Sequence, residues 1–356
     1  MTAFSLSPAI NHEHPAVWVR FIGAFPPWFL QPSKPRLSFW RLNAHSGGGS
    51  PADCVFSLYP PNANDRVGAS GGWGMLRVAL CVSFVSAVTL AKGAELETTH
   101  LFGFTFGSDV NAVGEKEAES EAIGRFGKSA GTYGAISQAL GVKFVPFQNF
   151  SIQPTVSVSR FDISNVPGLD DRRQLAYEAA SLELRYRLID REKAPFGLTV
   201  GFDPRWARVD EISGAPVDQY GSALLLIVDK ELVDKLIFAA FNFIYEPEAT
   251  RSRVTGDWER ASELGLSVAL AAQIRPGVLV GAEVRYMRSF DGLGLDRYTG
   301  NAVFVGPTFY ARFSEKTWMS AAWSAQVAGR AHNEMGALDM TNFERHRAML
   351  RFGYNF

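Results

Sequence analysis

The most constraining feature of this sequence is a two-residue period of apolar side chains that recurs along most of its length. It is clearest at the C-terminus, where Leu350, Phe352, Tyr354 and Phe356 alternate with small or polar residues up to the last position. Successive side chains of a β-strand point to opposite faces of its sheet, so this period predicts strands with one apolar and one polar face. The chain should therefore be all-β.

The same alternation appears in residues 180–188, 196–206, 264–274 and 278–289. These predicted strands have about ten or more residues, whereas strands of globular proteins usually have about five or six. Tight links such as "RPG" alternate along the chain with longer polar loops. Short turns on one rim and long loops on the other are typical of an outer-membrane barrel.

Counting such segments predicts a closed antiparallel transmembrane β-barrel of about 12 strands (range 10–14) over residues 115–356. Closure is the arrangement that leaves no unpaired backbone edge in lipid. A soluble β-sandwich also alternates and is the competing interpretation. Residues 94–114 precede the first strand. They form either one more strand, which would make the number odd, or a segment that plugs the lumen or lies below it on the periplasmic side; we favour the segment.

The N-terminal part has a different character. Residues 1–74 are rich in Pro, Gly, Ser and Asn without any sustained period, which predicts a disordered extension upstream of the true start. Residues 75–93 begin with methionine, carry one early arginine and continue with an apolar run that is too short to span a bilayer. This pattern predicts a signal peptide cleaved between Gly93 and Ala94. A buried core helix is the alternative.

Removal of residues 1–93 takes away both cysteines and seven of the 35 basic and three of the 36 acidic residues. The exported chain is then mildly acidic and has no thiol, which excludes disulfides and cysteine metal sites. Without a basic patch, it is a poor candidate for binding nucleic acid. Histidines are few and scattered, so we expect no metal site and no cofactor.

The ending "LRFGYNF" resembles the C-terminal signature of Gram-negative outer-membrane β-barrel proteins. Residues 94–356, including "NVPGLDDRR" and "LRYRLIDREKAPFGL", are similar to an uncharacterised, porin-like type of alphaproteobacterial barrel. The resemblance implies a location in the outer membrane, with its lipid as the surroundings. It also implies that the barrel-assembly machinery recognises the final strand, which assigns that role here to Leu350, Phe352, Tyr354 and Phe356.

Function is therefore expected in the lumen, where the polar faces of the strands point. The inward charged positions, taken from the alternation, are Lys143, Glu183, Arg185, Arg187, Asp203, Arg205, Glu263, Glu283, Arg285 and Arg312. Mixed charges facing inward predict a polar constriction that passes small polar solutes according to charge and size. The alternative is a structural or adhesive barrel, in which the same charges form ion pairs that brace a closed interior.

One charge pattern concerns closure of the barrel. Glu117, Glu119 and Glu121 share a face of the first predicted strand, and Arg347 and Arg351 share the inward face of the last. First and last strands are neighbours in a closed barrel, so we expect these acidic and basic rows to meet at the seam, each pair contributing about 0.2–1 kcal/mol. Alternatively, "EKEAESE" is a solvated loop or helix.

An enzyme is the least favoured reading. "GKSAG" around Ser129 spells the G-x-S-x-G motif of serine hydrolases, but that motif requires a turn from a strand into a helix. Here it falls at a predicted hairpin tip, and no histidine spacing completes a catalytic pair. A lipid hydrolase at the barrel rim remains only as a third hypothesis.

Overall fold

The computed structural model describes residues 97–332 and 334–356. The predicted N-terminal extension, signal peptide and cleavage site lie outside the described residues. Among the described residues, no helix is both long and apolar enough to cross a membrane.

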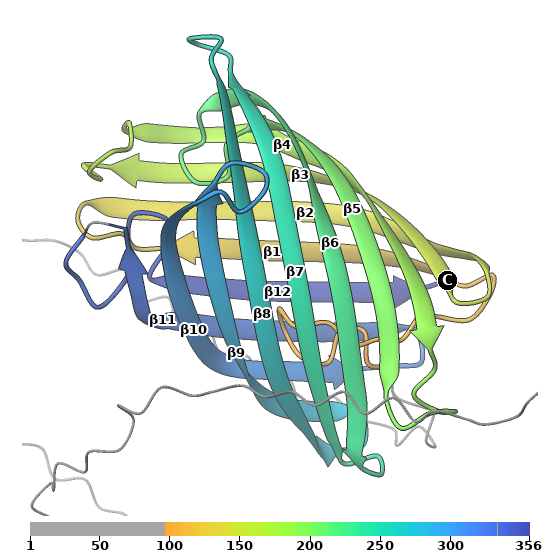
Figure 1. Ribbon diagram of the computed structural model, residues 1–356. Helices are drawn as coiled ribbons and strands as arrows, with labels where there is room; N and C mark the ends of the chain where they lie inside the picture. Colours follow the sequence, from red (N-terminus) through yellow and green to blue (C-terminus); the bar gives the residue numbers. More distant parts are fainter. Residues whose placement is uncertain (1–96, 333) are drawn as a thin grey trace, which may run out of the picture. The chain divides into compact units, whose positions relative to one another are not determined.

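Twelve antiparallel strands form one closed barrel in which each strand pairs with its neighbour in sequence and β1 pairs with β12 (Figure 1). The predicted fold class is confirmed. The strands are β1 (Lys116–Phe126), β2 (Thr132–Phe147), β3 (Phe150–Ser164), β4 (Arg172–Ile189), β5 (Gly197–Val209), β6 (Pro216–Val233), β7 (Ile237–Ser252), β8 (Trp258–Arg275), β9 (Val278–Asp291), β10 (Arg297–Arg312), β11 (Thr317–Ala331) and β12 (His346–Asn355).

The two ends of the barrel differ. One end, which we call the turn end, carries the start of β1, the end of β12 and tight connections such as residues 148–149 and 276–277. Asn149 and Gly277 have positive φ values of 65° and 76° there, the backbone conformation that short hairpins require. The opposite loop end carries the longest connection described, residues 332–345.

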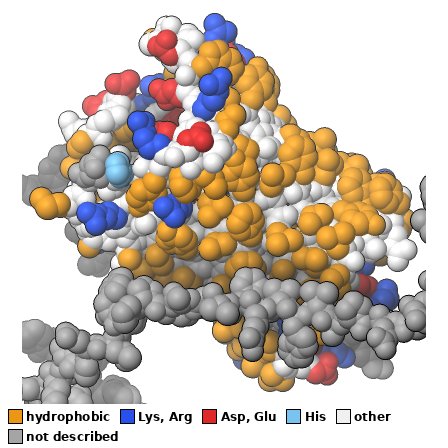
Figure 2. All heavy atoms as spheres, viewed as in Figure 1, with side chains coloured by type: hydrophobic (Ala, Val, Ile, Leu, Met, Phe, Trp, Pro, Cys, Tyr) orange, Lys and Arg blue, Asp and Glu red, His pale blue; other side chains and the backbone are white. Residues whose placement is uncertain are grey.

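The alternation read from the sequence sorts side chains as expected. Large apolar residues such as Leu140, Val268 and Phe352 are exposed on the outer surface. Figure 2 shows one side of the barrel, where apolar side chains form a broad belt. Polar residues on the other face, such as Asn242 and Glu283, are buried in the interior. This inverted distribution suits a barrel surrounded by lipid.

Residues 97–115 are not a strand of the sheet; most of them lie inside the barrel at the turn end, and the exposed residues 113–115 lead into β1 (Figure 1). Leu101 and Phe102 are completely buried against inward side chains of β7 to β11, among them Phe238, Leu279 and Trp318. The apolar core of the protein is therefore built between this lumenal segment and one wall of the barrel.

Candidate functional site in the barrel lumen

Hydrogen bonds from buried polar groups of the wall fix the lumenal segment. The Asp229 carboxylate of β6 accepts bonds from the Thr98 hydroxyl and from the backbone N–H and hydroxyl of Ser108. Asn242 of β7 forms two bonds with the backbone of Phe106, of 2.7 Å and 2.9 Å. Buried polar groups are costly without partners, so each side of this contact satisfies the other.

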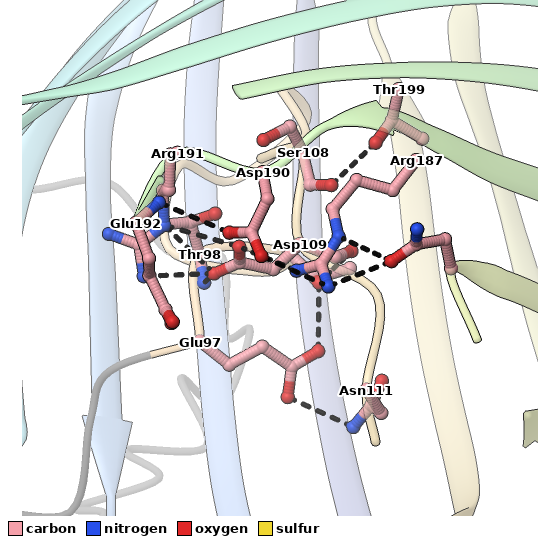
Figure 3. Close-up of polar contacts among 12 residues, drawn as sticks. Glu97, Thr98, Ser108, Asp109, Asn111, Arg187, Asp190, Arg191, Glu192 and Thr199 are labelled. Carbon is pink, nitrogen blue, oxygen red and sulfur yellow. Dashed lines mark hydrogen bonds and ion pairs between the residues drawn. The ribbon is translucent and has the colours of Figure 1, made fainter. Parts of the chain in front are cut away.

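The segment is also tied to the turn between β4 and β5. Figure 3 shows Asp109 beside Arg191 and Arg187; its carboxylate lies 3.0 Å from Arg191 Nη2 and 3.9 Å from Arg187 Nη1. The same carboxylate accepts a 2.8 Å hydrogen bond from the backbone N–H of Thr98, which closes the segment on itself. Arg187, a predicted lumen residue, thus contacts the lumenal segment at the turn end.

His100 is the centre of a second set of contacts, which we call the histidine latch: His100, Glu117, Glu119, Lys143 and Arg351. Arg351 of β12 donates a 3.1 Å hydrogen bond to His100 Nδ1, and the other ring nitrogen, Nε2, faces the carboxylates of β1. That nitrogen lies 3.3 Å from Glu119 and 3.6 Å from Glu117. Burial, followed by the nearby Lys143 charge, holds the pKa of His100 well below its usual value, which keeps the ring neutral.

The latch contains one imidazole and two carboxylates close enough to hold a metal ion. However, Lys143 Nζ lies 2.9 Å from Glu117 Oε1 and 3.3 Å from His100 Nε2, so an ammonium group already supplies the positive charge between them. The His100 ring stacks on Trp318 at 4.3 Å, and the Trp318 indole donates to Glu117. These contacts join the lumenal segment to β1, β2, β11 and β12.

Arg351 also connects the two strands of the seam. Its guanidinium lies 3.1 Å from Glu119 and also binds Glu121, both on β1. The other predicted seam residues have different partners, because the register places Glu117 opposite Asn355 and Arg347 opposite Arg125. Glu117 pairs with Lys143, as described above, and Arg347 pairs with Glu344 just before its own strand.

A polar cavity of about 230 Å³ lies beside the lumenal segment, against the wall formed by β1 to β5. Charged side chains of both signs line it, and several form ion pairs. Arg205 lies 2.7 Å from Glu178, and Arg125 lies 2.9 Å from Glu211. Arg125 first, and then Arg205, lower the pKa of Glu211 to about 2, so this loop carboxylate is ionised at neutral pH.

Part of the connection from β11 to β12 folds into the lumen at the loop end. Phe343 is buried there against Ala302 and Phe304, inward residues of β10. Gln326 of β11 donates a hydrogen bond to the Asp339 carbonyl, and Lys128 Nζ donates to the carbonyl of Phe343. The interior is thus narrowed from both ends, by the lumenal segment and by this connection.

Residues 94–356 match a family of unknown function, DUF6662. The chain belongs to this family. Among curated proteins, none matches it.

Solved structures show which fold this DUF6662 member shares. The COG4313 outer membrane channel from Pseudomonas putida F1 is similar with a TM-score of 0.50 at 12% identity, over 70% of this chain and 98% of that one. The NanC porin gives 0.41 at 11% identity, over 67% and 98% of the two chains. The KdgM porin in complex with disordered oligogalacturonate gives 0.38 at 10% identity, over 67% and 99%. At these identities the likeness shows the outer-membrane β-barrel fold alone.

The structure distributes the predicted lumen residues over several places in this DUF6662 barrel. Four line the cavity: Glu183, Arg185, Asp203 and Arg205. Lys143 belongs to the latch, and Glu283 and Arg285 contact the lumenal segment, where Glu283 accepts bonds from Thr105 and Arg285 lies 3.9 Å from the Phe104 ring centre. Glu263 pairs in register with Glu246 of β7. Arg312 lies at the turn end beside Gly277.

The sequence alternation missed Glu178, which accepts hydrogen bonds from Ser137 and Ser159 in the lumen. Counting back from Ala180 places it on the lipid face. The pairing of β3 with β4 shifts at Ser157 and Val158, and this bulge turns Glu178 inward. Asp229 and Asn242 were missed for another reason. The lumenal segment that they bind has no two-residue alternation, so the sequence did not predict where in the barrel it would lie.

Proposed function

We propose that the protein is a channel of the Gram-negative outer membrane that allows passive passage of small polar solutes. The observation that carries the proposal is the polar cavity of about 230 Å³ inside a closed barrel, lined by guanidinium and carboxylate groups of both signs. Such a lining favours hydrated and charged solutes over apolar ones. The fold shared with outer-membrane channels supports the same location, with the turn end in the periplasm.

We also propose a route to the membrane, which involves residues 75–93 and the last strand. Residues 75–93 are proposed to act as a signal peptide that is cleaved between Gly93 and Ala94. At the other end, Leu350, Phe352, Tyr354 and Phe356 are all exposed on the outer surface, where membrane lipid would contact them. We propose that the barrel-assembly machinery recognises this aromatic-ended strand.

The lumenal segment restricts the path that a solute can take through the barrel. Because residues 97–115 lie in the lumen at the turn end, solutes must pass beside the segment or it must shift. The cavity lies along β1 to β5, whereas Leu101 and Phe102 pack on β7 to β11, so the polar side is the more accessible path.

Planar bilayers containing purified residues 94–356 test the proposal. We expect discrete conductance steps with an ion preference that depends on the cavity. Arg205→Gln removes the partner of Glu178 and a partner of Glu211, so it should make the channel more cation selective. Arg160→Gln, on the exposed outer face of β3, is the matched control and should leave the reversal potential unchanged. A correctly folded barrel that never conducts would exclude a channel.

A structural or adhesive barrel is the second hypothesis, favoured by the many hydrogen bonds that hold the lumenal segment in place. A silent bilayer would support it. The hydrolase hypothesis gains no support from the turn at 127–131, where Ser129 lies between two strands instead of preceding a helix. Acyl release from phospholipid or lipid A by the purified protein would revive it.

A further inference from the structure

Two arginines and an asparagine form a row across three neighbouring strands on the outer face of the barrel. Asn301 of β10 lies opposite Arg288 of β9 and opposite Arg330 of β11. Residues directly opposite in an antiparallel pair share a face. The neighbours Ala302 and Phe304 of β10 are completely buried inside, which places the row on the outside.

The row lies at the boundary of the apolar belt, on the side of the loop end. Towards the turn end, the outward residues that follow are Tyr286 and Val284 on β9 and Val303 and Val305 on β10. Figure 2 shows charged side chains gathered at this end of the barrel and the apolar belt beside them. A membrane whose apolar layer covers the belt would bring its headgroups to the level of the row.

Neither arginine of the row has an acidic partner among the described residues. The nearby carboxylate of Asp291 is paired with Arg297 instead. The Arg288 guanidinium lies over the rings of Phe290 and Tyr298, at 5.1 Å and 4.7 Å, and the Tyr298 hydroxyl donates to the Arg330 carbonyl. Tyr298 thus contacts both arginine residues, and its ring orients the Arg288 guanidinium. An aromatic ring, however, does not neutralise the positive charge of either side chain.

Arg288 and Arg330 lie on β9 and β11, on the two sides of β10, and two positive charges beside a low-dielectric layer are stabilised by a counter-charge. No carboxylate of the described residues supplies it. Guanidinium groups match phosphate through paired N–H donors, and the Asn301 amide adds a further donor between them. We propose that Arg288, Asn301 and Arg330 bind the phosphate of an anionic lipid headgroup in the outer leaflet. The proposal rests on the proposed outer-membrane location with the loop end outside, but not on conductance.

The opposite side of the same rim provides a matched control. Arg160 of β3 and Arg173 of β4 are also exposed on the outer face near the loop end. There, however, Asp162 lies directly opposite Arg173, so the chain supplies its own negative charge. If basic side chains attract anionic lipid in general, lipid should bind at both places. If the site is specific, lipid should bind only at the row.

The test is a titration of purified residues 94–356 in uncharged detergent with diphosphorylated lipid A, followed by native mass spectrometry. We expect Arg288→Gln with Arg330→Gln to weaken binding at least about tenfold, because the double change removes both positive charges and their paired N–H donors. Arg160→Gln with Arg173→Gln should bind like the unaltered protein. Asn301→Ala should cause a smaller loss, and lipid A without phosphates should not bind.

Equal losses in the row and control variants would show a general rim attraction and overturn the proposal. Displacement of the lipid by inorganic phosphate at equal concentration would show a soluble-anion site, which would also overturn it. Heat-modifiable gel mobility checks that each variant is folded, and Asn301→Ala keeps the test decisive if the double variant is not. The row variants should conduct normally; a silent barrel that still binds lipid A would defeat the channel and leave this site standing.

Discussion

Arg351 Nη1 and His100 Nδ1 are 3.1 Å apart, and this hydrogen bond joins the last strand of the barrel to the segment in its lumen. The same guanidinium pairs with Glu119 and Glu121 of the first strand. One side chain therefore takes part both in closing the barrel and in holding the segment that obstructs it. A change at Arg351 should therefore affect both the closure of the barrel and the position of the lumenal segment.

Charge reversal at the seam should affect Arg351 far more than Arg347. Arg351→Glu would leave the buried carboxylates of Glu119 and Glu121 facing a third one, and breaking a buried ion pair costs about 3–5 kcal/mol. Arg347→Glu would lose Glu344 but face Arg125 across the seam, which compensates part of the cost. Heat-modifiable mobility and the unfolding temperature in detergent measure the difference, and equal effects would show that the Arg351 contacts do not stabilise the seam.

A covalent lock should hold the lumenal segment in place. Residues 94–356 contain no cysteine, so Ser108→Cys with Gly197→Cys introduces a single pair. A Cβ on Gly197 would lie 3.0 Å from Ser108 Cβ and 2.5 Å from Asp229 Oδ1, so the two cysteines must separate and the Asp229 side chain must move aside to reach the roughly 3.8 Å typical of disulfides.

If the segment shifts during conduction, oxidation of this pair should reduce conductance and reduction should restore it. Ser108→Cys alone, treated with the same oxidant, is the control. Unchanged conductance after complete oxidation would mean that solutes pass beside a stationary segment.

The lumenal segment should be held more weakly at high pH. Burial raises the pKa of Glu97 from its ordinary 4.5 to about 7, in surroundings that include Lys143 of β2, Glu117 of β1 and Asp109 of the segment. The arrangement with the segment in the lumen thus favours the protonated form of Glu97. Its contribution is complete below about pH 4.5 and is lost as the pH rises through about 7.

Hydrogen exchange of the Phe106 amide, which is bonded to Asn242, reports this change. After correction for the intrinsic rate, protection should fall between about pH 5 and pH 8. Glu97→Gln should remove that fall, because the amide does not ionise. The same pH dependence in Glu97→Gln would assign the effect to another group.

Gly353 should tolerate no side chain. A Cβ there would lie 2.1 Å from the Trp318 ring, which stacks on His100. Gly353→Ala should therefore displace the indole, loosen the latch and destabilise the barrel by about 1–3 kcal/mol. Gly265→Ala on β8 is the control, since its Cβ would make an ordinary 3.6 Å contact with Ile244. Thermal unfolding of both variants checks the difference, and equal unfolding temperatures would contradict the packing argument.

The sequence by itself determined the strands, their two faces and the closed barrel of twelve. The alternation follows from the backbone geometry of each strand, so it can be read locally. Closure follows because lipid cannot form hydrogen bonds to an unpaired strand edge. Parity also selected inward charges such as Arg205 and Arg351, which line the cavity together.

Only the tertiary structure decided which charges meet. Register placed Arg347 opposite Arg125 and away from the acidic residues of β1, and a bulge turned Glu178 inward. The path of residues 97–115 depends on Asp229 and Asn242, which are more than a hundred residues away in sequence. A one-dimensional pattern fixes the side of the sheet on which a residue lies, but partners across the lumen depend on how all twelve strands are staggered when the barrel closes.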